Sequence, residues 1–290
     1  MTSEVARRRR LVDGNLLGFL SPERCGMPGR LREAMEYSLK AGGKRIRPVM
    51  LLSAGAAVGG DEQALLPFAC AVEYIHTYSL IHDDLPAMDD DDFRRGRPTC
   101  HKAFGEAAAI LAGDALLTEA FRVMGESDLA IRDPGRAVRA IALLARAAGA
   151  EGMVGGQDLD LAARPGDSVE GIHRRKTAAL IEASAGMGGI LGGGAADRVA
   201  ALRRYGAAVG LLFQITDDIL DETGSFEEMG KAVAKDRERG KLTYPGQFGM
   251  AAAAARAEAL GLEAHAALAS FGDEAEPLRE IVRMVAARRS

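Results

Sequence analysis

The sequence predicts an all-α protein, a bundle of helices, and three observations lead to this. Alanine is abundant and runs of β-branched residues are scarce, which favours helix over strand. Long periodic segments alternate with short turns rich in glycine, proline and aspartate. The sequence shows neither alternating strand patterns bounded by hairpin turns nor repeats with a period of about 20–50 residues. We expect a single domain over residues 1–290 with about ten helices.

Turn sequences separate the predicted helices at 59–61, 132–135, 164–167 and 192–194. In one later segment, apolar residues recur at steps of three and four, so they share one helical face. They are Leu202, Tyr205, Val209 and Leu212. Asp167 or Ser168 can cap an earlier helix, with Glu170 placed to complete a capping box. The glycine-rich stretch 186–194 indicates close helix packing or a turn.

The global charge of the chain excludes two classes of partner. Its net charge is −4, so no general attraction to nucleic acid or to an anionic membrane surface is expected. Any anion must therefore be bound by a local group of cations. Cys25, Cys70 and Cys100 are odd in number and lack metal-ligand spacing, which indicates reduced thiols. We therefore expect a cytoplasmic protein.

The basic run 7–10 and the apolar residues after it resemble the start of a signal peptide. Asp13, Gly14 and Asn15 interrupt the apolar run, and no small-residue cleavage site follows. We expect a solvated basic turn before the first helix instead. No apolar stretch approaches the roughly 20 residues that span a bilayer, so stable membrane insertion is not expected.

The segment 83–92, here called the first acidic cluster, is a candidate site. It reads Asp-Asp-Leu-Pro-Ala-Met-Asp-Asp-Asp-Asp, with six carboxylates in ten residues. Like charges at this density repel one another unless cations neutralise them. The alternatives are a solvated acidic loop or an isolated calcium site. The order of ligands does not match an EF-hand, which argues against calcium.

Asp217, Asp218 and Asp221 form a second acidic cluster. In a helix Asp217 and Asp221 share a face, and Gln214 lies one turn earlier on that side. Oxygen ligands at this spacing suit Mg²⁺, which proteins hold with one or two carboxylates together with water and substrate phosphates. Because the acidic pattern occurs twice, we expect the two clusters to clamp a diphosphate through bridging metal ions.

Two basic segments accompany the acidic clusters. Residues 42–48 read Gly-Gly-Lys-Arg-Ile-Arg-Pro, and residues 94–98 read Arg-Arg-Gly-Arg-Pro. Arginine binds phosphate oxygens in a bidentate manner, and lysine supplies a point charge. Further cations near the second acidic cluster are Lys176, Lys231, Lys235 and Lys241. The alternative is that these charges make only surface ion pairs, each of which stabilises little.

Six blocks of the sequence resemble bacterial farnesyl diphosphate synthases, within the trans-isoprenyl diphosphate synthase family. The blocks are GGKRIRP at 42–48, EYIHTYSLIHDDLPAMDDDDFRRGRPT at 73–99, LAGDALL at 111–117, KT at 176–177, FQITDDILD at 213–221 and GKLTYP at 240–245. They follow the family's order over most of the chain. One departure is Ala234, next to Lys235, where the family commonly has a glycine.

The resemblance implies an all-α prenyltransferase fold around a central cavity, usually in a homodimer. It implies isopentenyl diphosphate and an allylic diphosphate as substrates, with Mg²⁺, up to three ions, as cofactor. The implied metal ligands are Asp83, Asp84, Asp89, Asp217 and Asp221. The implied ligands of isopentenyl diphosphate are Lys44, Arg47, His76 and Arg95. Those implied for the allylic diphosphate are Arg94, Lys176, Thr177, Gln214, Lys231 and Lys241. The residues implied to be catalytic are Asp83, Asp84, Asp89, Asp217 and Lys176.

Tyr78 and Ser79 are the candidates for setting product length. In a helix Tyr78 would lie about 7–8 Å along the axis from Asp83, on the path of a chain that grows from the metal ions. Ser79 is nearer the face of Asp83 but is too small to block a chain. Bacterial farnesyl synthases carry an aromatic residue at the position of Tyr78, and plant-type geranylgeranyl synthases carry a smaller one. The resemblance therefore implies a C15 product, farnesyl diphosphate, with C20 as the alternative.

Two alternative functions would use a similar sequence: that of a class I terpene cyclase and that of a non-catalytic subunit. A class I terpene cyclase would share the fold and the first aspartate motif, but it needs an Asn/Asp, Ser/Thr, Glu array in place of the second acidic cluster. A non-catalytic subunit of a hetero-oligomeric synthase would be expected to lose aspartates, whereas this chain keeps both clusters. We expect an enzyme that joins isopentenyl diphosphate to dimethylallyl and geranyl diphosphate.

Overall fold

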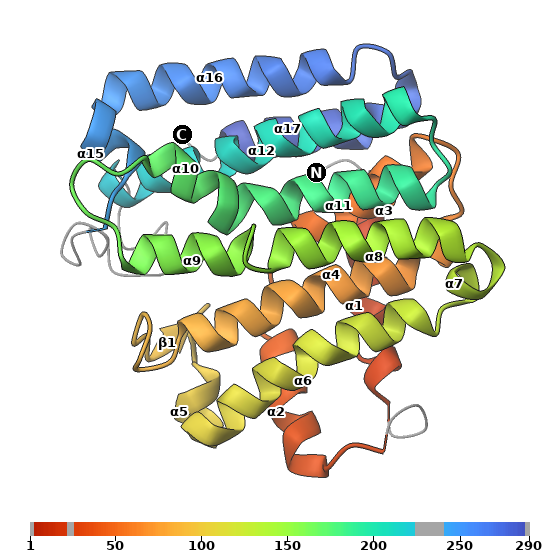
Figure 1. Cartoon of the computed structure of the whole chain (residues 1–290), viewed down its shortest axis with the longest axis vertical. Coiled ribbons are helices and arrows are strands. Elements are labelled where there is room, and N and C mark those ends of the chain that lie inside the picture. The colour runs from red at the N-terminus through yellow and green to blue at the C-terminus, as the bar shows by residue number, and fades with distance from the viewer. Residues whose placement is uncertain (1–2, 22–25, 224–240, 288–290) are drawn as a thin grey trace.

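The computed structural model describes residues 3–21, 26–223 and 241–287 and is a bundle of helices (Figure 1). The predicted all-α class is confirmed. The elements are α1 (Ser3–Asn15), η1 (Gly18–Leu20), α2 (Gly29–Leu39), α3 (Ile46–Ala56), α4 (Glu62–Asp83), β1 (Phe93–Arg94), β2 (Arg97–Pro98), α5 (Cys100–Phe104), α6 (Glu106–Gly125), α7 (Asp128–Arg132), α8 (Pro134–Ala148), α9 (Met153–Leu161), α10 (Val169–His173), the π-helical turn η2 (Arg174–Ala178), α11 (Ala179–Leu191), α12 (Ala196–Thr223), α15 (Tyr244–Phe248), α16 (Met250–Ala267), η3 (Asp273–Ala275) and α17 (Glu276–Ala286).

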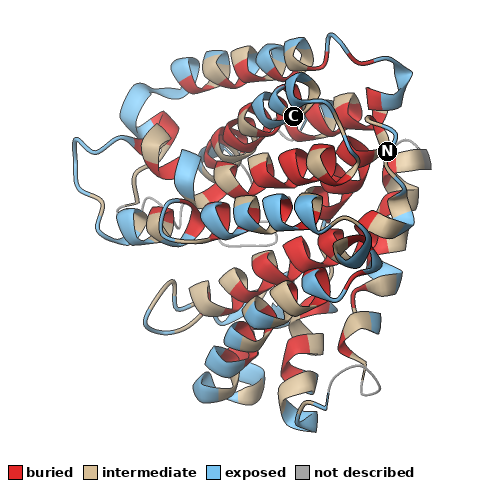
Figure 2. Ribbon diagram, turned by 45° about the vertical axis from the view of Figure 1, so that its right-hand side comes forward, coloured by how far each residue is buried: buried red, intermediate tan, exposed pale blue. Residues whose placement is uncertain are grey.

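The long helices lie roughly side by side, from α16 through α12 and α11 to α4 and α6 (Figure 1). Their buried apolar residues form two clusters. One joins α2, α4, α6 and α8 and includes Phe68 and Leu116, and the other joins α12, α16 and α17 and includes Tyr205. Helices α3 and α11 contribute residues to both clusters. They therefore connect the two halves of the core. Figure 2 shows the buried residues running through the interior of the bundle.

Glycines let the backbones of α3 and α11 pack in direct contact with each other. A Cβ added to Gly188 of α11 would lie 2.2 Å from the Leu51 carbonyl oxygen of α3 and 2.9 Å from the Gly55 nitrogen. Such distances leave no room for a side chain. Gly193 follows the helix with a φ of +81° and makes the turn into α12. The glycine-rich stretch thus serves both of the purposes predicted for it.

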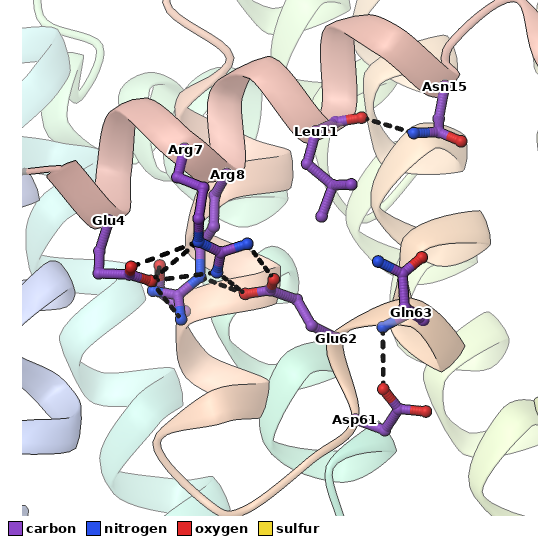
Figure 3. A network of polar contacts seen from close by, with 9 residues as sticks. Glu4, Arg7, Arg8, Leu11, Asn15, Asp61, Glu62 and Gln63 are labelled. Atoms are coloured by element: carbon purple, nitrogen blue, oxygen red, sulfur yellow. Dashed lines mark hydrogen bonds and ion pairs between the residues drawn. The ribbon is translucent and has the colours of Figure 1, made fainter.

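The basic run near the amino terminus lies inside α1, so the prediction of a solvated turn before the first helix was wrong. Arg8 is buried, and its Nε donates to Glu62 Oε1 at 2.6 Å. Arg7 donates to Glu4 Oε2 at 3.0 Å and to Glu62 Oε1 at 2.8 Å. These acidic partners neutralise the run and fix α1 against the start of α4 (Figure 3).

Two local predictions are confirmed and two are corrected. Ser168 caps α10, where its Oγ accepts a hydrogen bond from Gly171 N at 3.1 Å, but Glu170 accepts from Arg174 and does not complete a capping box. The apolar face predicted between 202 and 212 is buried in α12. The expected absence of hairpins was wrong, because β1 and β2 pair antiparallel. Arg95 and Gly96 join them with φ values of 54° and 74°, as a tight hairpin turn requires.

Helix α4 is long and apolar enough to cross a membrane by length and composition alone. This corrects the expectation that no stretch approaches that length. Of its apolar window, 72% is buried inside the protein, and the helix carries Glu73 and His76 before it ends at Asp83. Its apolar character is therefore that of a central core helix.

We expect Gly188→Ala to lower the free energy of unfolding by about 3 kcal/mol, because the added methyl group overpacks the contact of α11 with α3. Gly261→Ala in α16 is the matched control, since a Cβ there meets no atom within 4 Å. We expect this control to raise stability by about 0.5–1 kcal/mol through helix propensity. Urea unfolding followed by circular dichroism measures both. Equal changes in the free energy of unfolding for the two variants would show that α3 and α11 are not tightly packed at Gly188.

Candidate active site

The chain reverses where α4 ends and brings the first acidic cluster together. Pro86 prevents the helix from continuing. The Asp89 amide then donates to the Asp83 carbonyl at 2.8 Å, and the Asp91 amide donates to the Asp84 carbonyl at 3.2 Å. Burial raises the pKa of Asp83 to about 6, and the charges of Asp89 and Asp84 contribute to this while Lys176 opposes it. A crowded set of carboxylates of this kind fits a hard divalent cation.

Two of these carboxylates form ion pairs with basic side chains of the same protein. Asp84 is buried and accepts from Arg94 Nε at 2.9 Å and from Arg94 Nη2 at 2.6 Å. Burial raises the pKa of Asp84, although Arg94 opposes the rise. Lys241 Nζ donates to Asp89 Oδ1 at 3.0 Å. Two cations predicted to contact a diphosphate therefore lie directly at predicted metal ligands.

The carboxyl ends of α4 and α12 lie at the same side of the bundle (Figure 1). In the second acidic cluster the buried Asp218 has a different environment from its neighbours. Its Oδ1 accepts from Gln214 Nε2 at 2.9 Å, and its Oδ2 accepts from the Tyr244 amide at 2.8 Å. Asp218 therefore connects α12 to the start of α15. Asp217 and Asp221, one turn apart in α12, are the members predicted to bind metal.

Lys176 and Thr177 lie in the π-helical turn between α10 and α11. Lys176 Nζ donates to Asp160 Oδ2 at 2.5 Å, and Thr177 Oγ1 donates to Gln214 Oε1 at 2.8 Å. Turns of this kind are rare and occur frequently at functional sites. The turn joins α9 to α12 through polar side chains and directs both predicted residues to the end of the bundle where the acidic clusters lie.

The sequence interpretation missed Gln157 and Asp160 on α9. A Cβ added to Gly156 would lie 2.1 Å from the Lys176 nitrogen, so α9 packs directly on the π-helical turn. Both amide atoms of Gln157 are buried without a hydrogen-bonding partner in the described part of the chain. Consecutive glycines followed by polar residues, at 155–160, were the available signal.

A basic group lies beside α4, and its members differ in environment. Burial lowers the pKa of Arg47 to about 10, which Glu73 and Asp217 oppose and Arg95 reinforces. Arg47 Nε has no hydrogen-bonding partner among the described residues. Burial, followed by the charges of Arg47 and Arg95, lowers the pKa of His76 well below its usual value. His76 is therefore neutral at pH 7. Lys44 is exposed just before α3.

Arg45 and Arg95 hold the loop that precedes α3. Arg45 is buried, and its Nη1 donates to Glu73 Oε1 at 2.7 Å. Arg95 Nη1 donates to the Gly42 carbonyl oxygen. A Cβ on Gly43 would lie 2.7 Å from Arg95 Nη1, so this position requires glycine. Of the cations in 42–48, Arg45 is thus structural.

Tyr78 is buried on α4, and its ring contacts His82 edge to face with the centroids 5.8 Å apart. Burial raises the pKa of Tyr78 to about 12, and the charge of Asp83 adds to the shift. The phenol is therefore near the acidic end of the helix. Ser79 Oγ donates to the His76 carbonyl at 2.9 Å.

Four residues of the sequence interpretation lie outside the described residues: Cys25, Lys231, Ala234 and Lys235. The other two cysteines, Cys70 and Cys100, are buried free thiols.

Asp83→Asn should stabilise the metal-free protein at pH 8 by up to about 3 kcal/mol. The folded pKa of about 6 exceeds the usual 3.8, so protonation stabilises the fold. The stabilisation by protonation of Asp83 is complete below pH 3.8 and is lost as the pH rises through about 6. Urea unfolding in EDTA at several pH values tests it, and the advantage should vanish near pH 4. Asp158→Asn, at an exposed site on α9, should change stability by less than about 0.5 kcal/mol.

Comparison with known proteins identifies relatives along most of the chain. The model of the family described as polyprenyl synthetase matches residues 28–279. A farnesyl diphosphate synthase from Geobacillus stearothermophilus is 51% identical over 235 residues, which are 80% of this chain and 79% of that protein. The chloroplastic large subunit 1 of a heterodimeric geranylgeranyl pyrophosphate synthase from Arabidopsis thaliana is 48% identical over 272 residues, 91% of this chain and 73% of that protein.

Solved structures agree in fold. An FPP/GFPP synthase from Zymomonas mobilis has a TM-score of 0.83 at 37% identity, with 97% of each chain covered. A geranylgeranyl pyrophosphate synthetase from Pyrococcus horikoshii has a TM-score of 0.86 at 30% identity, with 98% of each chain covered. The chain therefore belongs to the polyprenyl synthetase family of prenyltransferases.

Proposed function

We propose that the protein is a farnesyl diphosphate synthase of the cytoplasm, which joins isopentenyl diphosphate to dimethylallyl and then to geranyl diphosphate. The observation that carries the proposal is the pairing of two acidic helix ends with two separate groups of cations. Dependence on Mg²⁺ is general in the family. We assign Asp83, Asp84, Asp89, Asp217 and Asp221 as the residues that hold Mg²⁺, which when bound neutralises the charge that develops on the departing diphosphate.

The residues around the π-helical turn are assigned to the allylic diphosphate. Lys176 and Lys241 supply positive charge to its oxygens when they leave Asp160 and Asp89. Thr177 and Gln214, already hydrogen-bonded to each other at 2.8 Å, are pre-positioned to contact the same group. Preorganised donors of this kind lower the barrier because they need not reorient as charge develops.

The basic group beside α4 is assigned to isopentenyl diphosphate. Lys44, Arg47 and Arg95 would hold its diphosphate directly, and the neutral His76 can donate one hydrogen bond. Arg47 Nε, buried without a partner in the described residues, is suited to an anionic ligand. Holding this substrate places its double bond to attack the allylic carbon. The departing diphosphate accepts the proton that is then lost.

Tyr78 supports a C15 product. It is buried one to two helical turns before Asp83, near enough for that carboxylate to raise the Tyr78 pKa. An aromatic ring at this depth would stop a chain of three isoprene units. The relatives include farnesyl and geranylgeranyl synthases at similar identity, so a C20 product is the second candidate.

A homodimer is part of the proposal. Large apolar side chains are exposed on neighbouring faces of α6, α7 and α8, and the most exposed are Leu111, Ile131 and Val138. Large apolar side chains left exposed in this way favour association with another protein surface. A second copy of the chain would cover it.

We expect the purified wild-type protein with Mg²⁺ to release mainly C15 diphosphate, as measured by mass spectrometry. Tyr78→Ala should shift the product to C20 or longer, because the obstacle on α4 is removed. Tyr78→Phe is the matched control and should keep C15, since it preserves the ring. Mainly C20 from the wild type, or an unchanged distribution in Tyr78→Ala, would refute the role of Tyr78.

Arg95→Ala should raise the KM for isopentenyl diphosphate at least about tenfold, the effect of losing one charge-assisted contact. The KM for geranyl diphosphate should change much less. Arg97→Ala is the control on the same hairpin, where the guanidinium stacks on the Tyr37 ring 4.4 Å away. Steady-state kinetics with each substrate varied in turn measures this. Equal shifts in both KM values would contradict the division into two substrate positions.

A further inference from the structure

A second set of possible metal ligands lies on the far part of the first acidic cluster. One ligand atom each from Asp90, Asp92 and His101 lies within 4.8 Å of the other two. The chain turns sharply at Asp90, which has a φ of +50°. Asp90 and Asp92 come from the loop after α4, and His101 comes from α5. The three residues thus join two elements that flank the β1–β2 hairpin.

His101 provides an independent sign of a ligand. Its side chain is only 6% exposed, and Nε2 has no hydrogen-bonding partner among the described residues. The other ring nitrogen, Nδ1, lies 3.1 Å from Thr99 Oγ1. A histidine that binds a metal through one nitrogen commonly has the other engaged in such a bond, which fixes the tautomer and ring orientation. A buried imidazole nitrogen without a partner is otherwise unfavourable.

We propose that Asp90, Asp92 and His101 Nε2 bind one divalent transition-metal ion such as Mn²⁺, Co²⁺ or Zn²⁺. Imidazole nitrogen favours these ions over Mg²⁺, which prefers oxygen ligands. Lys102 Nζ now pairs with Asp92 Oδ1 at 2.7 Å, but both side chains are largely exposed, so the lysine can move aside at little cost. The remaining coordination positions would be filled by water.

This site differs from the proposed Mg²⁺ positions in its ligands and in the segments of the chain that a bound ion would connect. The proposed Mg²⁺ ligands Asp83 and Asp89 lie where the loop folds back on the end of α4, with the Asp89 amide bonded to the Asp83 carbonyl. Asp89 also pairs with Lys241. An ion on Asp90, Asp92 and His101 would instead fasten that loop to α5. It would thereby restrict the β1–β2 hairpin, which carries Arg94 and Arg95. Its role is structural and it takes no part in the transfer reaction.

Isothermal titration with Co²⁺ tests the site in the full chain. The protein carries Asp83→Asn and Asp217→Asn, which remove ligands from the proposed Mg²⁺ positions, and the buffer contains excess Mg²⁺. We expect one Co²⁺ per chain, with a visible absorption band that indicates nitrogen ligation. Adding His101→Gln or Asp90→Asn should weaken binding at least tenfold. His265→Gln on α16 is the control and should leave the affinity unchanged.

Two results would overturn the proposal. One is the absence of Co²⁺ binding in the variant that carries only the two aspartate substitutions and retains its helical circular dichroism. The other is binding that neither His101→Gln nor Asp90→Asn weakens. Asp90 is exposed, so Asp90→Asn decides the question even where His101→Gln disturbs the packing of α5. Loss of prenyl transfer in the aspartate variants concerns the proposed function only and leaves this test unaffected.

Discussion

The crowding of carboxylates at one end of the bundle is the constraint on which the arrangement of the site depends. Six acidic residues follow one another closely where α4 ends, and more lie on α9 and α12. The chain offsets this charge with its own cations: Asp84 with Arg94, Asp89 with Lys241, and Asp160 with Lys176. In the proposed function each of these cations exchanges its carboxylate for a diphosphate oxygen, and Mg²⁺ ions bind Asp84 and Asp89 in place of Arg94 and Lys241. The ion pairs that hold the site together thus consist of the groups that the proposed function assigns to the diphosphate and to the metal ions.

A rigid scaffold keeps these groups in place. The buried ion pair of Arg45 with Glu73 anchors the loop before α3 to α4. Breaking such a pair by removing one partner leaves an uncompensated buried charge and costs about 3–5 kcal/mol. The glycine contact of α3 with α11 connects the same region to the other half of the core. The ion pair and the glycine contact together fix the positions of α4, which ends in the first acidic cluster, and of α11, which follows the π-helical turn.

The sequence predicted the helical class, because helical spacing is a local signal. Its charge blocks also contain the partners that the structure brings together, Asp84 with Arg94 and Asp89 with Lys241. The charge pattern of residues 42–48 does not distinguish Arg45 from Arg47, and only the family resemblance singled out Arg47. The left-handed conformation at Arg45 depends on tertiary partners such as Glu73. The β1–β2 hairpin escaped notice because each strand has only two residues. Gln157 was missed because the glycines and polar residues at 155–160 are a weak signal that does not show which other helix α9 packs against. The basic run in α1 was misread because its acidic partner Glu62 lies far along the chain.

The π-helical turn at Arg174–Ala178 sets a limit on how this part of the gene can vary in length. The Ala179 amide bonds to the carbonyl of Arg174, five residues back, so the turn contains one residue more than a regular helical turn. Deleting one residue here would restore an unbroken helix but rotate α10 by about 100° relative to α11. Lys176 and Thr177 would then lose their common direction toward Asp160 and Gln214. Insertions and deletions should be tolerated in the surface turn before α10 and excluded from these five positions.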